Sequence, residues 1–267
     1  GALPESELRR LREFGGLQSY PSRTKDPPLV DFSTGSMGLG CAAPVFAALT
    51  QKYAHAHFGA TTASRFVTMS GDAELDEGNV WEMLLDESMA MDNALWIVDL
   101  NRQSLDRVVP HIRAARLKRI FQACGWRVFE AKYGARLQAA FARPGGEALR
   151  EAIDAMDNEE YQSLIRSDGA AVRAVLAELP RGAEISACLT GVTDAELPGL
   201  LANLGGHDLP ELMRVLEKSE VSPPQPTVIL AYTIKGWGLP VAADPLNHGA
   251  LLSPERFAAF RDSLGIS

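Results

Sequence analysis

The stretch "RFVTMSGDAELDEGNVW" (65–81) decides the fold that we predict for this chain. Its first residues form a short apolar run typical of a buried strand, and the Ser70-Gly71 pair then ends the run. Four acidic residues follow at once: Asp72, Glu74, Asp76 and Glu77. In α/β folds, ligands bind beyond the carboxyl ends of the strands. These carboxylates therefore stand where a ligand is expected.

A second polar loop follows the apolar run 94–100, in "ALWIVDLNRQSLD" (94–106). Such a run is typical of a strand buried on both faces of a parallel sheet. If the two strands are neighbours, Asp72 and Asn101 converge on one crevice. Their oxygen atoms suit Mg²⁺ or Ca²⁺, and Mg²⁺ usually keeps ligands from a phosphate, so the pair predicts a metal-bridged phosphate ligand. The alternative stays open that Asp72 caps a helix and Asn101 makes a turn.

The rest of the chain alternates predicted strands with predicted helices. We expect strands at 65–70, 94–100, 126–134 and 226–236. Helices are expected at 40–59, with Gly59 as the stop, at 75–92, at 110–125 and at 253–265, with Ser253 at the start. Residues 145–219 are expected to be mostly helical, with breaks at Pro180 and Pro198. The apolar residues Trp81, Leu84, Leu85 and Met89 would share one side of the 75–92 helix. This alternation predicts an α/β fold with a doubly wound, mostly parallel sheet and flanking helices.

The composition is that of a globular protein, with 46% apolar and 22% charged residues among 267. A net charge of −8 argues against a nucleic-acid partner. No apolar run reaches the length of a membrane span, so no membrane partner is expected. The widely spaced Cys41, Cys124 and Cys188 indicate buried thiols in a reducing compartment, which predicts a cytoplasmic protein.

The sequence Gly71-Asp72-Ala73 followed by Asn101 resembles the thiamine diphosphate motif, which begins Gly-Asp-Gly and ends in Asn after a strand–helix–strand unit. More specifically, the chain resembles the homodimeric first, decarboxylating component of bacterial pyruvate dehydrogenase complexes. The matching segments keep their order along the whole chain: "GGLQSYP" (15–21), "TGSMGLG" (34–40), "GDAELDE" (71–77), "NRQSLD" (101–106), "GWRVFEAKYG" (125–134), "DNEEYQSLIRSDGAAVR" (157–173), "GGHD" (205–208) and "TVILAYTIKGWG" (227–238).

The resemblance implies a role for each residue at a matching position. Asp72 and Asn101 would bind Mg²⁺ through their side chains, and Gln103 would bind it through its backbone carbonyl. Residues implied to bind thiamine diphosphate are Ser19, Gly35, Ser36, Met37, Gly71, Asp72, Ala73, Glu74, Asn101, Lys235 and His248. Tyr20 and His248 are the candidate catalytic residues. The family's cofactor-activating glutamate belongs to a pyrimidine-binding domain, which we do not find in this sequence.

Structural interpretations of several of these residues stay open. Met37 could be a core residue, Tyr20 could pack on a surface arm, and His207 could sit at a helix cap. Lys235 is expected to be a loop cation near the mouth of the ligand site.

The resemblance also implies a domain organisation and a function. Residues 1–30 would be an arm of the same domain, and 31–267 a transketolase-like diphosphate-binding domain that is incomplete at its N-terminus. The implied activity is oxidative decarboxylation of a 2-oxo acid, with pyruvate expected, and transfer of the acyl group to lipoyl. Implied partners are a pyrimidine-binding domain or chain, further subunits in a homodimer or hetero-oligomer, and a lipoyl-bearing acyltransferase. The chain alone is expected to be inactive.

Two departures from the family pattern leave alternatives open. Ala73 replaces the second glycine of the motif, and a positive φ at that position would cost about 1 kcal/mol. Tyr232 replaces the histidine of the family's "HTIKG" segment. The segment "NHGALL" (247–252) is closer to transketolase, which suggests two-carbon transfer as a second function. A non-catalytic or partial subunit that needs a partner chain is the third.

Overall fold

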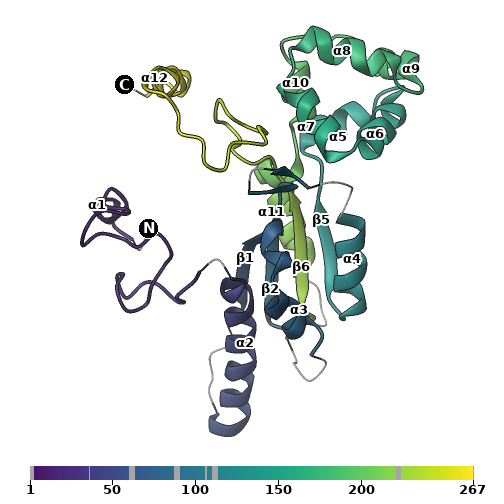
Figure 1. The fold of residues 1–267 in the computed structure, drawn as a ribbon. Helices are drawn as coiled ribbons and strands as arrows, with labels where there is room; N and C mark the ends of the chain where they lie inside the picture. The colour runs from purple at the N-terminus through teal and green to yellow at the C-terminus, as the bar shows by residue number, and fades with distance from the viewer. Residues whose placement is uncertain are drawn as a thin grey trace. The chain divides into compact units, whose positions relative to one another are not determined.

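The computed structural model describes residues 3–35, 37–59, 64–86, 91–105, 107–109, 114–220 and 224–266. Its main sheet has four strands in the order β1-β2-β6-β5 (Figure 1). These strands are β1 (Phe66–Gly71), β2 (Ala94–Leu100), β5 (Arg127–Ala131) and β6 (Thr227–Tyr232). All four were predicted, and the sheet is mostly parallel with flanking helices, so the predicted α/β class is confirmed.

Helices account for most of the other described elements. Their bounds are α1 (Glu5–Leu8), α2 (Leu39–Phe58), η1 (Asp72–Asp76), α3 (Gly78–Leu84), α4 (Ala114–Ala123), α5 (Ala135–Phe141), α6 (Gly146–Ala155), α7 (Asn158–Arg166), α8 (Gly169–Glu178), α9 (Gly182–Cys188), α10 (Leu197–Leu201), η2 (Gly205–His207), α11 (Leu209–Ser219) and α12 (Pro254–Ser263). No helix in these described ranges combines the length and the apolarity needed to cross a membrane.

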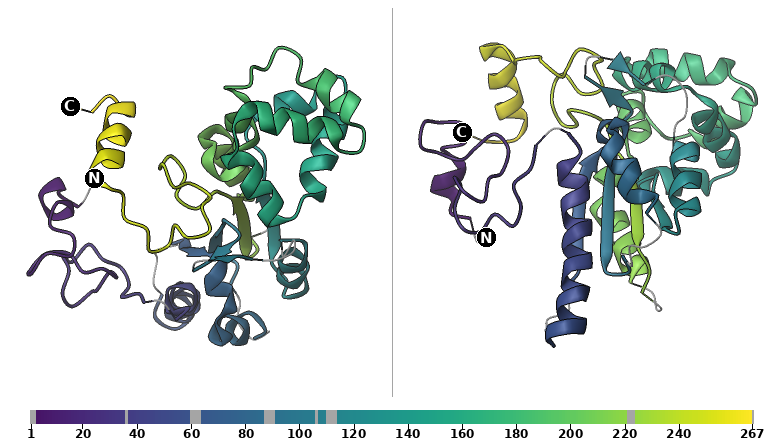
Figure 2. Two further views of the ribbon diagram at one scale, coloured as in Figure 1. Left: turned by 45° about the horizontal axis from the view of Figure 1, so that its top comes forward. Right: turned by 60° about the horizontal axis from the view of Figure 1, so that its bottom comes forward.

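The chain divides into two compact units. The first holds residues 1–98, 120–128 and 221–229, and the second holds 99–119, 129–220 and 230–267. In the first unit, α2 packs along β1 (Figures 1 and 2). Gly59 ends α2 in the left-handed conformation, with its N–H bonded to the carbonyl of His55, so the predicted glycine stop is confirmed.

An aromatic cluster forms part of the first unit's core. The rings of Trp96, Phe121 and Trp126 meet edge to face, with centroids 5.6–5.9 Å apart. This is the geometry that the quadrupoles of aromatic rings favour. The cluster ties β2 to residues 121–126, which lead into β5.

The helix predicted at 75–92 is different in the structure. A 3₁₀ helix, η1, begins at Asp72, the backbone becomes extended at Glu77, and α3 covers only Gly78–Leu84. Leu85 follows α3 and is exposed, so it does not belong to the buried side as predicted. Met89 lies outside the described residues.

In the second unit, helices α5–α10 pack around one another (Figure 2). The buried Tyr161 hydroxyl on α7 donates to the carbonyl of Leu201 at 2.6 Å, which joins α7 to the end of α10. Pro180 separates α8 from α9, as predicted. Pro198 was predicted to break a helix, but it lies in the first turn of α10, where proline is well tolerated.

The second unit also contains a hairpin that we did not predict. Strands β3 (Gln103–Ser104) and β4 (Arg107–Val108) pair antiparallel, with Gln103 opposite Val108. Near the C-terminus, the Ser253 hydroxyl accepts the backbone N–H of Arg256 at the start of α12. The predicted start of the terminal helix is therefore confirmed.

Candidate functional site

A pocket of about 430 Å³ in the first unit brings together three of the predicted site residues. Tyr20 from the N-terminal arm, Gly35 from the loop before α2, and Glu74 from η1 all line it. The remaining lining residues are Pro21, Val30, Asp31, Phe32, Thr34, Gly40, Pro44, Val67, Thr68 and Met69. The sequence thus identified segments that meet at one cavity although they lie far apart along the chain.

The pocket is acidic and otherwise largely apolar. Among the described residues that line it, only Asp31 and Glu74 carry charge, and both are carboxylates. Such a lining suits a cationic or neutral ring better than an anionic group, because a buried anion would face like charges.

The Gly71-Asp72-Ala73 segment lies where β1 passes into η1. Asp72 is buried, with 7% of its surface exposed. A Cβ atom added to Gly71 or to Gly35 would meet nothing within 4 Å, so both glycines border open space. A ligand can therefore approach the backbone at both positions.

Ala73 carries none of the strain that we considered possible. It lies inside the right-handed η1 helix and is absent from the residues with positive φ. The missing second glycine of the motif thus costs no backbone energy in this conformation.

The other predicted residues of the first unit are spread around this pocket or beyond it. Met37 is 66% exposed and is not a core residue. Ser19 is exposed and does not line the pocket. Ser36 lies outside the described residues. Next to them, Gly38 has a φ of 72°, and a Cβ there would come within 2.6 Å of the Asn79 amide oxygen, so this loop packs closely against α3.

The second unit holds the other two predicted metal ligands, in a tight turn after β2. The Asn101 Oδ1 accepts the Gln103 backbone N–H at 3.0 Å, and the Asn101 Nδ2 donates to the Asp99 carboxylate at 3.4 Å. The Gln103 side chain is buried and donates to the amide oxygen of Gln162 at 2.6 Å. The alternative reading of Asn101 as a turn residue is thus correct, although an amide oxygen retains a second lone pair for a cation.

Arg102, between these two residues, was missed by sequence reasoning. It has a φ of 65°, its guanidinium lies 4.7 Å from the centre of the Tyr161 ring, and it donates to the Thr233 carbonyl at 3.3 Å. Burial raises the pKa of Tyr161 to about 12, so its ring faces the cation as a neutral phenol. The signal available in the sequence was an arginine flanked by two predicted ligands.

Lys235 and His248 are brought together in the second unit. The Lys235 ammonium donates to the Leu105 carbonyl of the β3–β4 hairpin at 2.8 Å and lies 3.3 Å from the His248 Nδ1. The Asn247 amide donates to the Lys235 carbonyl at 3.0 Å. The predicted loop cation therefore joins the hairpin that starts at Gln103 to the segment that carries His248.

His207 has a structural role in the same unit. Its Nε2 accepts the Ile234 backbone N–H at 2.7 Å, and its ring stacks on Trp237 at 4.6 Å. Burial lowers its pKa, which favours the neutral ring that this acceptor role needs. The helix cap is Asp208, whose carboxylate accepts the Glu211 N–H at 3.1 Å.

Tyr232 points towards β5. Its hydroxyl donates to the Glu130 carboxylate at 3.2 Å, and the other carboxylate oxygen of Glu130 accepts from Lys118. Burial and the nearby Glu130 charge raise the pKa of Tyr232 above its usual range, so the phenol stays protonated.

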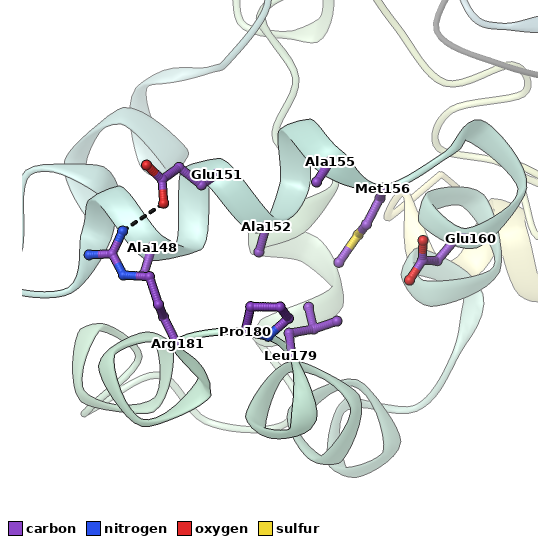
Figure 3. Close-up of a pocket in the computed structure, with 9 residues that line it drawn as sticks. All are labelled: Ala148, Glu151, Ala152, Ala155, Met156, Glu160, Leu179, Pro180 and Arg181. Carbon is purple, nitrogen blue, oxygen red and sulfur yellow. Dashed lines mark hydrogen bonds and ion pairs between the residues drawn. The ribbon is translucent and has the colours of Figure 1, made fainter.

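A second pocket, of about 260 Å³, lies among the helices of the second unit (Figure 3). Its lining is mainly apolar side chains of α6 and the α8–α9 connection. Arg181 pairs with Glu151 across one end of it, at 2.6 Å, and Glu160 lies at the opposite end. None of the predicted site residues lines this pocket.

The described ranges contain no cluster of three or more His, Cys, Asp or Glu residues that could hold a metal ion. The donors at hand, a carboxylate of Asp72 in the first unit and the oxygens of Asn101 and Gln103 in the second, have the hard chemistry that suits Mg²⁺. The residue types present are therefore those that the predicted cation and cofactor require.

Solved structures that resemble this chain include transketolases. Transketolase from Leishmania mexicana matches with a TM-score of 0.62 at 19% identity over 99% of this chain and 30% of that one. Transketolase from Campylobacter jejuni matches with a TM-score of 0.61 at 18% identity over 98% of this chain and 30% of that one. At these identities the likeness defines the fold class alone.

The sequence defines the family. Residues 2–157 match the family "Transketolase, thiamine diphosphate binding domain", which is more than half of the chain, and the chain belongs to this family. The matched range includes the first pocket, the Gly71-Asp72 turn and the Asn101–Gln103 turn.

Curated relatives carry the name "Pyruvate dehydrogenase E1 component". The protein of Buchnera aphidicola (Acyrthosiphon pisum) is 30% identical over 254 residues, covering 92% of this chain and 28% of the relative. That of Escherichia coli K12 is 29% identical, with coverages of 92% and 28%. That of Cupriavidus necator is 31% identical over 280 residues, with coverages of 100% and 30%. The chain thus spans less than a third of the length of these relatives.

Proposed function

We propose that this chain is the diphosphate-binding part of a thiamine-diphosphate- and Mg²⁺-dependent enzyme of the pyruvate dehydrogenase E1 type. The observation that carries the proposal is the family match over 2–157, which spans both polar turns and the acidic pocket. The proposed reaction is oxidative decarboxylation of a 2-oxo acid, with pyruvate as the first candidate and a lipoyl group as acyl acceptor. The names of the curated relatives support this choice.

In this proposal the cofactor supplies the electron sink for decarboxylation, and the chain supplies binding and orientation. Asp72, Asn101 and Gln103 are the proposed Mg²⁺ ligands. The acidic lining of the first pocket, with Glu74 and Asp31, favours the positively charged ring of the cofactor. Lys235 and His248 supply donors for anionic groups.

The proposal also concerns assembly and location. A pyrimidine-binding domain or chain, further subunits in a homodimer or hetero-oligomer, and a lipoyl-bearing acyltransferase are the proposed partners. A cytoplasmic location is proposed, and the three free thiols are compatible with it.

Calorimetric titration of the complete native protein with thiamine diphosphate, with and without Mg²⁺, tests the cofactor assignment. We expect binding that requires the metal. Asp72→Asn should weaken it by more than the roughly 10- to 100-fold that loss of an outer-shell partner costs. The matched control, Asp76→Asn, changes an exposed carboxylate of the same helix and should have little effect. Equal losses in both variants would show that the wrong carboxylate is assigned.

The competing function is transketolase-type two-carbon transfer, which the "NHGALL" segment and the transketolase fold favour. Parallel assays of pyruvate decarboxylation and ketose cleavage separate the two. Turnover of a ketose without turnover of pyruvate would replace the first proposal. A non-catalytic subunit is the third candidate, and turnover on addition of a pyrimidine-domain partner would exclude it.

A further inference from the structure

Two side-chain hydrogen bonds, from Trp96 to Ser70 and from Cys41 to Glu74, lie between the core of the first unit and the acidic pocket. The Trp96 indole N–H on β2 donates to the Ser70 hydroxyl on β1 at 2.8 Å. The Cys41 thiol on α2 donates to the Glu74 Oε2 on η1 at 3.2 Å, and the neighbouring Ser70 hydroxyl lowers the pKa of that thiol. Glu74 lines the pocket, whereas Trp96 and Cys41 have no exposed surface.

The chemistry of these groups fixes which atom donates and which accepts in each hydrogen bond. An indole nitrogen can only donate, so the Ser70 oxygen accepts from Trp96 and its own hydrogen is available for Cys41. Burial raises the pKa of Cys41 to about 12, so the thiol keeps its hydrogen and can donate to the Glu74 carboxylate. Ser70 lowers the pKa of Cys41 and Glu74 raises it.

We propose that Cys41 is a positioning residue, which holds the Glu74 carboxylate in the wall of the acidic pocket through the hydrogen bond that its thiol donates. The inference rests on the proposed function in one respect, because the ligand of that pocket is taken to be thiamine diphosphate.

The position of Cys41 explains how a buried thiol acts on the pocket. It lies in the first turn of α2, and its backbone N–H donates to the Gly38 carbonyl at 3.0 Å. The thiol therefore connects two elements that line the pocket, α2 at Gly40 and Pro44 and η1 at Glu74. A half-buried glutamate side chain still has several rotamers, and a fixed donor restricts them before the ligand arrives.

The first test compares thiamine diphosphate affinity, measured with Mg²⁺ present, in variants of the complete native protein. Cys41→Ser keeps both a donor and an acceptor and should bind within about twofold of wild type. Cys41→Val has similar volume but no donor, and it should bind roughly fivefold more weakly, which corresponds to a hydrogen bond of about 1 kcal/mol. Cys124→Ser is the matched control for removal of a thiol away from the pocket. Equal affinity of Cys41→Val and wild type, or equal losses in the Ser and Val variants, would overturn the proposal.

The second test needs no cofactor. The S–H stretching band of Cys41 is isolated as the infrared difference between wild type and Cys41→Val. In Glu74→Ala this band should move to higher frequency, because the hydrogen-bond acceptor of the thiol has been removed. An unchanged band would overturn the hydrogen bond from Cys41 to Glu74 whatever the affinities are. If wild type binds no thiamine diphosphate, the proposed function fails, and this band alone decides whether the thiol holds Glu74.

Discussion

The hydrogen bond between His207 and Ile234 predicts a specific pH dependence of stability. The His207 imidazole accepts the Ile234 N–H through Nε2, which requires that this nitrogen carry no proton. Burial lowers the pKa of His207, an effect that the nearby Asp99 carboxylate partly opposes. As the pH falls, His207 therefore takes up a proton at a higher pH in the unfolded protein than in the folded protein. Stability should be level above about pH 6.5 and should fall as the pH drops below that value.

The variant His207→Phe separates the hydrogen bond from the packing. A phenyl ring can keep the stack on Trp237, which is nearly parallel to the imidazole at 13°, but it cannot accept a hydrogen bond. The Ile234 N–H then loses its partner in a buried position, which should cost about 1–3 kcal/mol. For a chain of this size each kcal/mol should lower the Tm by roughly 2–4 °C.

Denaturant unfolding of the complete protein, followed by circular dichroism at about pH 7.5 and about pH 5.5, measures both effects. We expect His207→Phe to be less stable at the higher pH and to lose the His207 part of the pH dependence. His57→Phe, a change at an exposed histidine on α2, should keep the wild-type dependence. A wild-type protein with equal stability at both pH values, or a His207→Phe variant with the full wild-type slope, would refute this reasoning.

Two further predictions follow from burial and backbone geometry. In the native protein, a thiol reagent should label Cys124 first, because this thiol is partly exposed. Cys41 and Cys188 are buried and should react only after unfolding. Fast labelling of Cys41 would contradict the structure. Gly71→Ala should leave the Tm unchanged but weaken cofactor binding, because its Cβ would enter open space beside the turn. Gly38→Ala should instead lower the Tm by several degrees, because φ is 72° and the Cβ would clash; equal Tm values for the two variants would contradict this.

The main elements could be predicted because their signals are local. The apolar run 94–100 is long and uninterrupted, and it forms β2 as expected. Gly59 and Ser253 end and begin helices by backbone and side-chain chemistry that is visible in the sequence. The segments that line the acidic pocket were found through the family resemblance, which draws on the order of motifs along the whole chain.

The errors arose where distant residues decide the local structure. The helix expected at 75–92 is interrupted at Glu77, and a Cβ at Gly38 would come within 3.1 Å of the Glu77 Cβ, so a neighbouring loop packs against this point. The β3–β4 hairpin escaped prediction because its strands are very short and Leu105 takes a positive φ that leucine rarely adopts. Cys41 was read only as a buried thiol of a reducing compartment, since its hydrogen bond to Glu74 is invisible in the linear sequence.

The aromatic cluster of Trp96, Phe121 and Trp126 gives the first unit its own optical signature. Two indoles held at a fixed 70° in a dry environment form a coupled chromophore, which produces near-ultraviolet circular dichroism only while their packing is intact. Trp237, stacked on His207, lies in the second unit and is 57% exposed, so its emission reports on a different and wetter environment. Near-ultraviolet circular dichroism can therefore follow the packing of the first unit's core without any added label.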